Sequence, residues 1–195
     1  VEKAAFSPGE DVPEVYQTVT EQSDTRYRIA VAEGVTSWQI VNALNAFDVL
    51  DGRIQDIPPE GSLAPDSYEV EAGDAGSGVI EQMRRAQDII LAEAWQNRSA
   101  DLPLETPYEA LILASIIEKE TGVPEERNQV ASVFVNRLER NMRLQTDPTV
   151  IYGITNGQGV LGRGLRQSEL RKATSYNTYV IEGLPPTPIA NPGRD

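Results

Sequence analysis

The sequence predicts an α+β protein in which a small strand–helix–strand unit precedes a mainly helical, loop-rich unit. Two extended segments enclose one short helical pattern near the beginning of the chain. Three longer segments with apolar residues at helical spacing follow. The charge also changes near residue 105: residues 1–105 hold 20 acidic and 7 basic side chains, whereas residues 106–195 hold 10 of each. We therefore expect two units with different roles.

The first unit is expected at residues 25–75. The preceding residues 1–24 are polar and acidic, and we assign them to a linker or to the remnant of a preceding unit. From Thr25, apolar and charged residues alternate, which predicts a half-buried strand. The side chains expected on its inner face are Tyr27, Ile29 and Val31.

A helix and a return strand complete this unit. Thr36 and Gln39 have the spacing of a capping box, in which each side chain bonds the other residue's backbone N–H. Apolar residues at helical intervals follow. Residues 56–66 hold three prolines and a glycine, so they form a loop. Residues 67–70 are the predicted return strand.

A connecting helix is predicted within residues 76–105, after a glycine-rich break. Its apolar residues recur at helical spacing and form a broad face. They are Val79, Ile80, Met83, Ile90, Leu91, Ala94 and Trp95.

The second unit, residues 106–195, begins with two predicted helices. The first starts at Thr106, which has a capping-box spacing with Glu109, and it stops near Gly122. Pro124 opens the next helix, because proline is favoured in the first turn. The expected buried stripe of that helix is Val130, Val133, Phe134 and Leu138. After Leu144 we expect loops whose hydroxyls, amides and tyrosines form a binding surface.

The composition excludes several classes of protein. The chain has no histidine and no cysteine, which rules out Ser-His and Cys-His nucleophiles, disulfides and most catalytic zinc sites. Carboxylates are then the first candidates for proton transfer, and we expect no metal and no cofactor. The net charge of −13 argues against a nucleic-acid partner. No signal peptide is recognised at Val1, and the longest apolar run, residues 111–117, is too short to span a bilayer.

One carboxylate falls inside an apolar helical pattern. At about 100° per residue, Glu118 lies close to Leu111 and between Ala114 and Ser115. Burial would raise its pKa, which suits a general acid. Glu120 lies on the opposite side, and periodicity alone does not choose between the two glutamates. In the alternative interpretation both occupy an exposed last turn, with Lys119 as a neighbouring counter-charge.

Long blocks of the sequence closely resemble the endolytic murein transglycosylases, the MltG or YceG-like family. The blocks are EALILASIIEKET at 109–121, VASVFVNRL at 130–138, MRLQTDPTVIYG at 142–153, YNTY at 176–179, GLPP at 183–186 and PIA at 188–190. Upstream, AEG at 32–34, PEG at 59–61 and PDSY at 65–68 look like the LysM-like subdomain of that family. The resemblance covers residues 25 to about 193.

The resemblance implies a bacterial cell-wall lyase without a cofactor. Such enzymes cleave the β-1,4 bond between N-acetylmuramic acid and N-acetylglucosamine inside peptidoglycan glycan strands and leave a 1,6-anhydro-muramoyl end. A single N-terminal membrane helix, which would precede this chain, anchors the active domain outside the cytoplasmic membrane. Peptidoglycan synthases, including penicillin-binding proteins, are the implied candidate protein partners.

The resemblance also assigns residues. The family's catalytic glutamate falls on Glu118, which is expected to protonate the glycosidic oxygen and then to take the C6 hydroxyl proton. Gln145, Tyr176 and Asn177 are the candidate sugar contacts, by analogy with goose-type lysozymes. The alternative for these three residues is hydrogen bonding that braces loops.

One departure from the family keeps a second function class open. The family usually continues past residue 193 with a segment that includes histidine, whereas this chain stops at Asp195. We therefore expect a catalytic domain that is C-terminally truncated relative to the family. The alternative function is a catalytically impaired peptidoglycan-binding or scaffold module of the cell-wall synthesis machinery.

Overall fold

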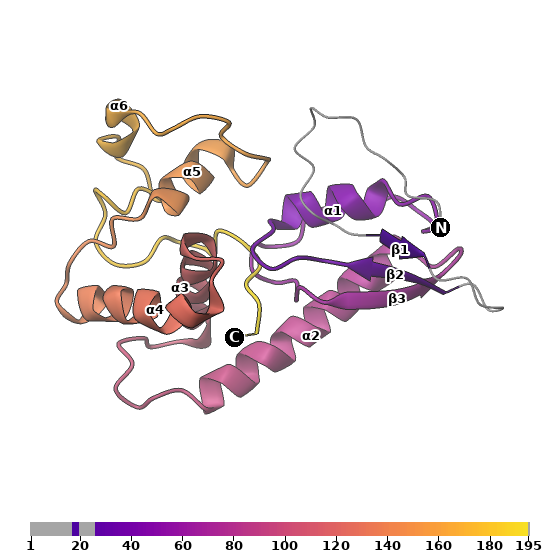
Figure 1. Cartoon of the computed structure of the whole chain (residues 1–195), viewed down its shortest axis with the longest axis horizontal. Coiled ribbons are helices and arrows are strands. Elements are labelled where there is room, and N and C mark those ends of the chain that lie inside the picture. Colours follow the sequence, from indigo (N-terminus) through magenta and orange to yellow (C-terminus); the bar gives the residue numbers. More distant parts are fainter. Residues whose placement is uncertain (1–16, 20–25, 195) are drawn as a thin grey trace.

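The computed structural model describes residues 17–19 and 26–194 (Figure 1). Figure 1 shows a sheet with α1 and α2 beside it and a group formed by α3 to α6, and the last described residues run between the two. The elements are β1 Gln17–Val19, β2 Arg26–Ala30, α1 Ser37–Asn45, β3 Ser67–Glu71, α2 Gly76–Gln96, α3 Pro107–Glu120, α4 Pro124–Glu139, α5 Asp147–Thr155 and α6 Gln167–Leu170. The α+β prediction is therefore confirmed. Within the described ranges, no helix has both the length and the hydrophobicity to cross a membrane.

The first core lies between the sheet and two helices. The strands are antiparallel in the order β1-β2-β3, with Ile29 of β2 opposite Tyr68 of β3. Residues i and i+2 of a strand share a face, so one face of β2 and β3 is apolar. That face packs against the apolar stripes of α1 and α2. The core residues of these elements are Ile29, Ile40, Val41, Leu44, Tyr68, Val70, Val79, Ile80 and Met83.

The assignment of residues 1–24 to a linker is wrong at β1. Gln17–Val19 pairs with β2, and Gln17 lies opposite Ile29. A three-residue strand held by backbone hydrogen bonds carries too little side-chain alternation to be recognised from sequence. The other residues of the predicted linker lie outside the described ranges.

The second core is built around α3. Ile112, Leu113 and Ile116 of this helix are at most 4% exposed, and they pack with Phe134 of α4 and with residues from the later loops. The near-continuous apolar surface of α3 is thus buried as predicted. The predicted stripe of α4 is wrong at Val133, which is 46% exposed. Val133 is rotated about 100° from Phe134, so it lies outside the single face that α4 turns toward α3.

The segment after Leu144 is more helical than predicted. It contains α5, which starts after Thr146 with Asp147 and Pro148 in its first turn and ends at Asn156 in the left-handed conformation. It also contains the single turn α6. A threonine followed by aspartate and proline is a helix-start signal, but the flanking glycines led us to expect a loop.

The first turn of α3 provides a stability prediction. The Thr106 hydroxyl accepts the Glu109 backbone N–H at 3.2 Å, and the Glu109 carboxylate accepts the Thr106 backbone N–H at 3.1 Å. Thr106→Ala should lower the free energy of unfolding, measured by urea denaturation, by about 1 kcal/mol, because the Glu109 N–H loses its side-chain acceptor. Thr106→Ser keeps the hydroxyl and should recover most of this loss. Equal losses in both variants would contradict a role for the cap.

Candidate active site

Glu118 and Glu120, two residues apart on α3, occupy different environments. The Glu118 side chain is only 8% exposed. Glu120 is exposed, and its carboxylate accepts a hydrogen bond from the Thr146 hydroxyl at 2.8 Å. The interpretation that places both glutamates in an exposed last turn therefore does not hold for Glu118.

Three segments converge on the Glu118 carboxyl. The backbone N–H of Gly193, in the C-terminal segment, donates to Oε2 at 3.2 Å. The Arg127 Nη2 atom of α4 lies 3.7 Å from Oε1. Gly34, in the loop after β2, lies beside it: an added Cβ would be in van der Waals contact with the Glu118 Cγ, at 3.4 Å. Its φ of +76° also favours glycine. Glu118 thus lies where the two units and the C-terminal segment meet.

The environment of Glu118 favours its neutral form. Removal of the carboxyl from water raises its pKa, and the nearby Glu33 carboxylate adds to the increase. The Gly193 N–H, Arg127 and Lys119 act in the opposite direction, but burial outweighs them. The pKa is therefore shifted in the direction that suits a general acid.

A second carboxyl, Glu60, is also half-buried near this junction. Its Oε1 accepts the backbone N–H of Ser37 at 2.7 Å and the side-chain amide of Asn191 at 3.2 Å. The Tyr152 hydroxyl donates to Oε2 at 3.2 Å. Burial raises the pKa of Glu60 in spite of these donors. Burial also lowers the pKa of Lys119, whose ammonium donates to the Gly34 carbonyl at 3.1 Å.

Gln145 retains the properties of a binding residue. Its side chain is exposed, and its backbone has a φ of +53°, a conformation uncommon for a residue other than glycine. Its backbone N–H donates to the Thr178 carbonyl at 3.1 Å. The next residue, Thr146, contacts Glu120 at the end of α3. Gln145 therefore lies beside the last turn of α3 with its amide open to solvent.

Tyr176 and Asn177 are more deeply integrated into the fold. The half-buried Tyr176 ring packs on Tyr152 with centroids 5.1 Å apart, and its hydroxyl shares a 2.7 Å hydrogen bond with Thr187. Asn177 is completely buried. Its amide donates to three backbone carbonyls, those of Glu169, Leu170 and Lys172. This placement favours the loop-bracing alternative for Asn177, because no part of its side chain is left to meet a sugar.

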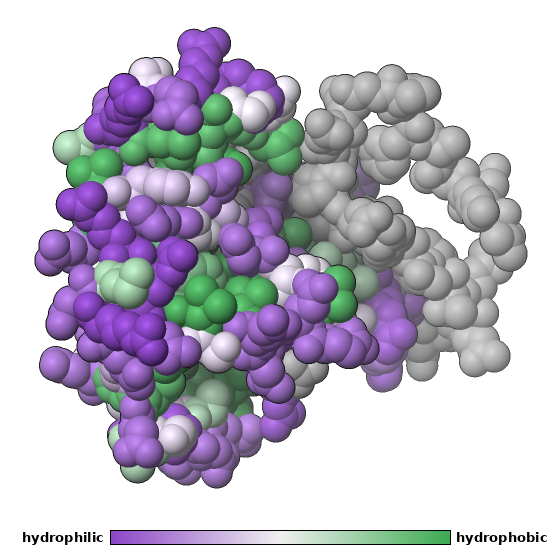
Figure 2. All heavy atoms as spheres, turned by 60° about the vertical axis from the view of Figure 1, so that its left-hand side comes forward, coloured by the Kyte–Doolittle hydropathy of each residue, from purple (hydrophilic) through white to green (hydrophobic). Residues whose placement is uncertain are grey.

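Two residues connect the candidates to the half-buried and exposed carboxylates. Thr146, the neighbour of Gln145, contacts Glu120 of α3, and Tyr152 joins Tyr176 to Glu60 in the loop before β3. The side of the molecule that carries α4, α5 and α6 shows apolar patches between hydrophilic ones (Figure 2).

The sequence profile of the YceG-like family matches residues 4–195, a span that includes each candidate residue. The chain belongs to the YceG-like family.

Proteins similar to this YceG-like chain have names that state an activity. It is 34% identical over 146 residues to an endolytic murein transglycosylase of Bacillus subtilis (strain 168), covering 75% of the chain and 39% of that protein. It is 33% identical over 142 residues to an endolytic murein transglycosylase of Streptococcus pneumoniae (strain D39), covering 70% and 24%. A crystal structure of a YceG-like protein from Listeria monocytogenes matches with a TM-score of 0.64 and 29% identity, covering 87% of the chain and 64% of that structure. The chain thus spans less than half of each curated relative.

Sequence reasoning on this YceG-like chain missed Glu60 as a member of the site. An acid between proline and glycine is typical of an exposed loop. The PEG motif at 59–61 therefore indicates a resemblance to the family but not a buried carboxyl. No local signal shows that the chain folds this loop against Tyr152, 92 residues away. Contacts of this kind become visible only in the folded structure.

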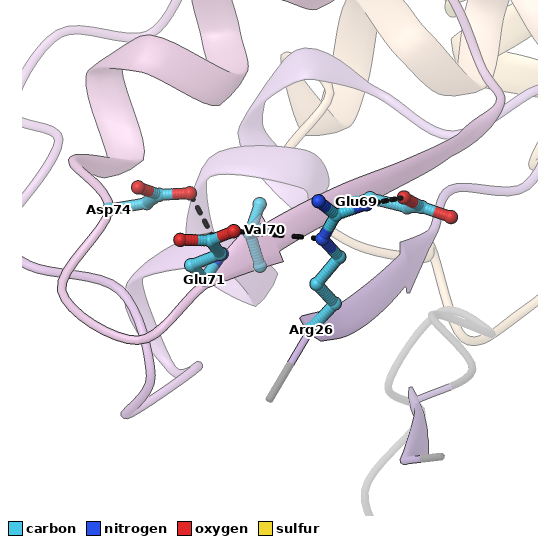
Figure 3. A pocket seen from close by; sticks show the side chains of 5 residues that line it. All are labelled: Arg26, Glu69, Val70, Glu71 and Asp74. Carbon is cyan, nitrogen blue, oxygen red and sulfur yellow. Dashed lines mark hydrogen bonds and ion pairs between the residues drawn. The ribbon is translucent and has the colours of Figure 1, made fainter. Parts of the chain in front are cut away.

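A pocket of about 270 Å³ lies elsewhere in the YceG-like chain, on the exposed side of β2 and β3 (Figure 3). Its lining residues are Arg26, Glu69, Val70, Glu71 and Asp74. Arg26 lies 3.7 Å from Glu69 and 3.6 Å from Glu71, and all three side chains are more than 60% exposed. These are ordinary surface ion pairs, and none of the candidate site residues lines the pocket.

Proposed function

We propose that this chain is the lytic part of an endolytic murein transglycosylase. As a lyase it cleaves the β-1,4 bond between N-acetylmuramic acid and N-acetylglucosamine within glycan strands and leaves 1,6-anhydro-muramoyl ends. The names of the relatives support the reaction class. The observation that carries the proposal for this chain is the Glu118 carboxyl, 8% exposed on the central helix of the second unit.

The chemistry requires one carboxyl group rather than two. Most glycosidases use one carboxyl to protonate the leaving oxygen and another to attack the sugar or activate water. In the proposed reaction, neutral Glu118 gives its proton to the glycosidic oxygen as the C1–O bond breaks. The C6 hydroxyl oxygen of the muramoyl residue then bonds to C1, and the Glu118 carboxylate takes the hydroxyl proton. The N-acetyl group of the substrate stabilises the oxocarbenium-like state between the steps.

The burial of Glu118 suits its role as a proton donor, and its contacts suit its later role as a carboxylate that takes a proton. The raised pKa keeps the proton available for transfer. The Gly193 N–H at 3.2 Å and Arg127 at 3.7 Å stabilise the carboxylate that remains after this transfer. A solvent-exposed glutamate such as Glu120 lacks this combination.

Gln145 and Tyr176 are the proposed sugar contacts, and Asn177 supports them by fixing the loop. The open amide of Gln145 is suited to bonding an N-acetyl group or a hydroxyl. The half-buried ring of Tyr176 offers an apolar surface for a sugar ring. Asn177 fixes the loop through the three hydrogen bonds that its side-chain amide donates to backbone carbonyls.

Gln145→Gly should separate stability from substrate binding. Glycine adopts the φ of +53° without a Cβ penalty, so the free energy of unfolding should be unchanged or up to about 1 kcal/mol higher. The KM for glycan strands should rise severalfold while kcat changes little, because the amide is lost. Gln145→Asn keeps an amide and tolerates this conformation, so its KM should be intermediate. An unchanged KM in the glycine variant would remove Gln145 from the sugar contacts.

The proposed substrate also leads to a proposed location and to proposed partners. Murein lies outside the cytoplasmic membrane, so we place this unit outside the membrane as part of a cell-surface protein held by an N-terminal anchor. Peptidoglycan synthases make the strands that this reaction would shorten, so they are the proposed protein partners.

The products of murein digestion test the proposed function. Purified sacculi incubated with the chain should release fragments with anhydro-muramoyl ends, which are one water lighter than hydrolytic products in mass spectrometry. Reducing ends would indicate a hydrolase and contradict the lyase mechanism. If the chain sediments with sacculi but releases no fragments, the glycan-binding alternative is supported instead.

A further inference from the structure

Arg127 lies between two carboxylates where the two units meet. Its Nη2 atom is 2.8 Å from Oε2 of Glu33 and 3.7 Å from Oε1 of Glu118. The first distance is that of a charge-assisted hydrogen bond, and the second is that of a looser ion pair. The guanidinium side chain is 13% exposed, so water screens it only partly. The closer interaction of Arg127 thus goes to Glu33, 94 residues away in the sequence.

The position of Glu33 is fixed by the same contacts that shape the site. The next residue, Gly34, donates its N–H to the Asn191 carbonyl at 2.8 Å and contacts Glu118. On the other side, a Cβ added at Gly193 would overlap the Glu33 carboxyl group. The Glu33 side chain, 42% exposed, therefore lies at the rim of the site, beside α4 and the segment that donates to Glu118.

Among the residues that the structure describes, three charged side chains act on Glu118 from the elements packed around it. They are Glu33 from the loop after β2, Arg127 from α4 and Lys119 from α3 itself. Lys119 directs its ammonium to the Gly34 carbonyl. If Arg127 moved into a direct hydrogen bond with Glu118, it would favour the carboxylate form and lower the pKa. Glu33 opposes this move by attraction of the guanidinium and by its own negative charge.

We propose that Glu33 is a positioning residue for the reaction: it holds the Arg127 guanidinium away from direct contact with Glu118, so that Glu118 retains its proton before bond cleavage. This inference rests on the proposed function of Glu118. It gives the small first unit a part in catalysis, because that unit supplies the carboxylate that controls the cation. After proton transfer, the same guanidinium is close enough to stabilise the Glu118 carboxylate.

The pH profile of kcat/KM on purified glycan strands tests this proposal. Cleavage requires neutral Glu118, so kcat/KM should fall as the pH rises through the pKa of this group in the free enzyme. Glu33→Gln removes one negative charge and the charged partner of Arg127 at 2.8 Å, so the midpoint of this fall should move down by about one pH unit. Above both midpoints the rate should then be roughly tenfold lower than in the wild type. Arg127→Met should move the midpoint up.

Opposite shifts in the two variants separate an electrostatic role from a structural one. Loss of packing would lower the rate at all pH values in both variants and leave the midpoint in place. Glu125→Gln provides the control, because it makes the same charge change at an exposed position on α4 and should leave the midpoint unchanged. A midpoint in Glu33→Gln equal to that of the wild type would overturn the proposal.

The variants also test the proposed role of Glu118 separately from that of Glu33. If Glu118→Gln is inactive while Glu33→Gln keeps the wild-type midpoint, the positioning role of Glu33 fails and the function stands. If Glu118→Gln stays active, Glu118 is not the catalytic acid, and the positioning role of Glu33 fails with that assignment. Should Glu33→Gln not fold, as judged by circular dichroism, Arg127→Met decides: an upward shift supports the proposal, and an unmoved midpoint overturns it.

Discussion

Replacement of Glu118 by glutamine should lower the rate of glycan cleavage by about 10²–10⁴-fold, the usual contribution of a general acid–base group. Glutamine has nearly the same shape and can still accept the Gly193 N–H, so the fold should persist. It cannot give a proton to the glycosidic oxygen or take one from the C6 hydroxyl. The rate is measured as release of anhydro-ended fragments from sacculi, with circular dichroism as the check on folding.

Glu120→Gln is the matched control for this experiment. It makes the same chemical change on the same helix, two residues away, at an exposed carboxylate that contacts Thr146. Its rate should stay within about twofold of the wild type, because only the buried group is proposed to move protons. Wild-type activity in Glu118→Gln would exclude the assigned acid, and loss of activity in Glu120→Gln alone would transfer the role to that residue.

The starts of α1 and α3 could be predicted because their signals are local. Thr36 with Gln39 and Thr106 with Glu109 form capping boxes in the structure, and each depends on residues only three positions apart. The strand β1 depends instead on pairing with β2, and its three residues carry no pattern of their own. Residues close in sequence thus determine where α1 and α3 start, whereas the edge strand β1 forms only by pairing with β2.

The candidate site could be predicted only in part for the same reason. Helical periodicity placed Glu118 and Glu120 on opposite sides of α3 but could not say which side would be covered. The backbone at Gly34 and Gly193 covers the Glu118 side chain, and both residues lie far from Glu118 in sequence. The family resemblance favoured Glu118, and the structure provides a physical reason: that carboxyl is buried and the other is exposed.

Asn191 holds the C-terminal segment against the first unit, and its side chain is completely buried. Its Oδ1 accepts the Leu63 N–H at 3.0 Å. Its Nδ2 lies 3.1 Å from the Val35 carbonyl and 3.2 Å from both the Ser37 hydroxyl and a Glu60 oxygen. Polar groups this deep must be paired. One amide therefore satisfies the loop after β2, the start of α1 and the loop that carries Glu60.

Asn191→Ala should lower the free energy of unfolding by about 2–4 kcal/mol, because it leaves the buried Leu63 N–H and the other partners of the amide unpaired. Chemical denaturation measures this change. Asn42→Ala, at an exposed position on α1, should stay within about 0.5 kcal/mol of the wild type. A loss below 1 kcal/mol at position 191 would mean that water replaces the amide.

The same substitution should affect activity beyond its effect on stability. Gly193, which donates to Glu118, follows Asn191 by two residues, and the backbone of Asn191 also pairs with Gly34 and Val35. Loss of the side-chain anchor loosens this segment, so the enzyme should lose cleavage rate even where it is fully folded, at low temperature and without denaturant. Folded Asn191→Ala with the wild-type rate would show that the backbone bonds alone keep the Gly193 N–H in place. A reduced rate would mean that the buried amide stabilises the fold and also positions the donor that meets the catalytic carboxylate.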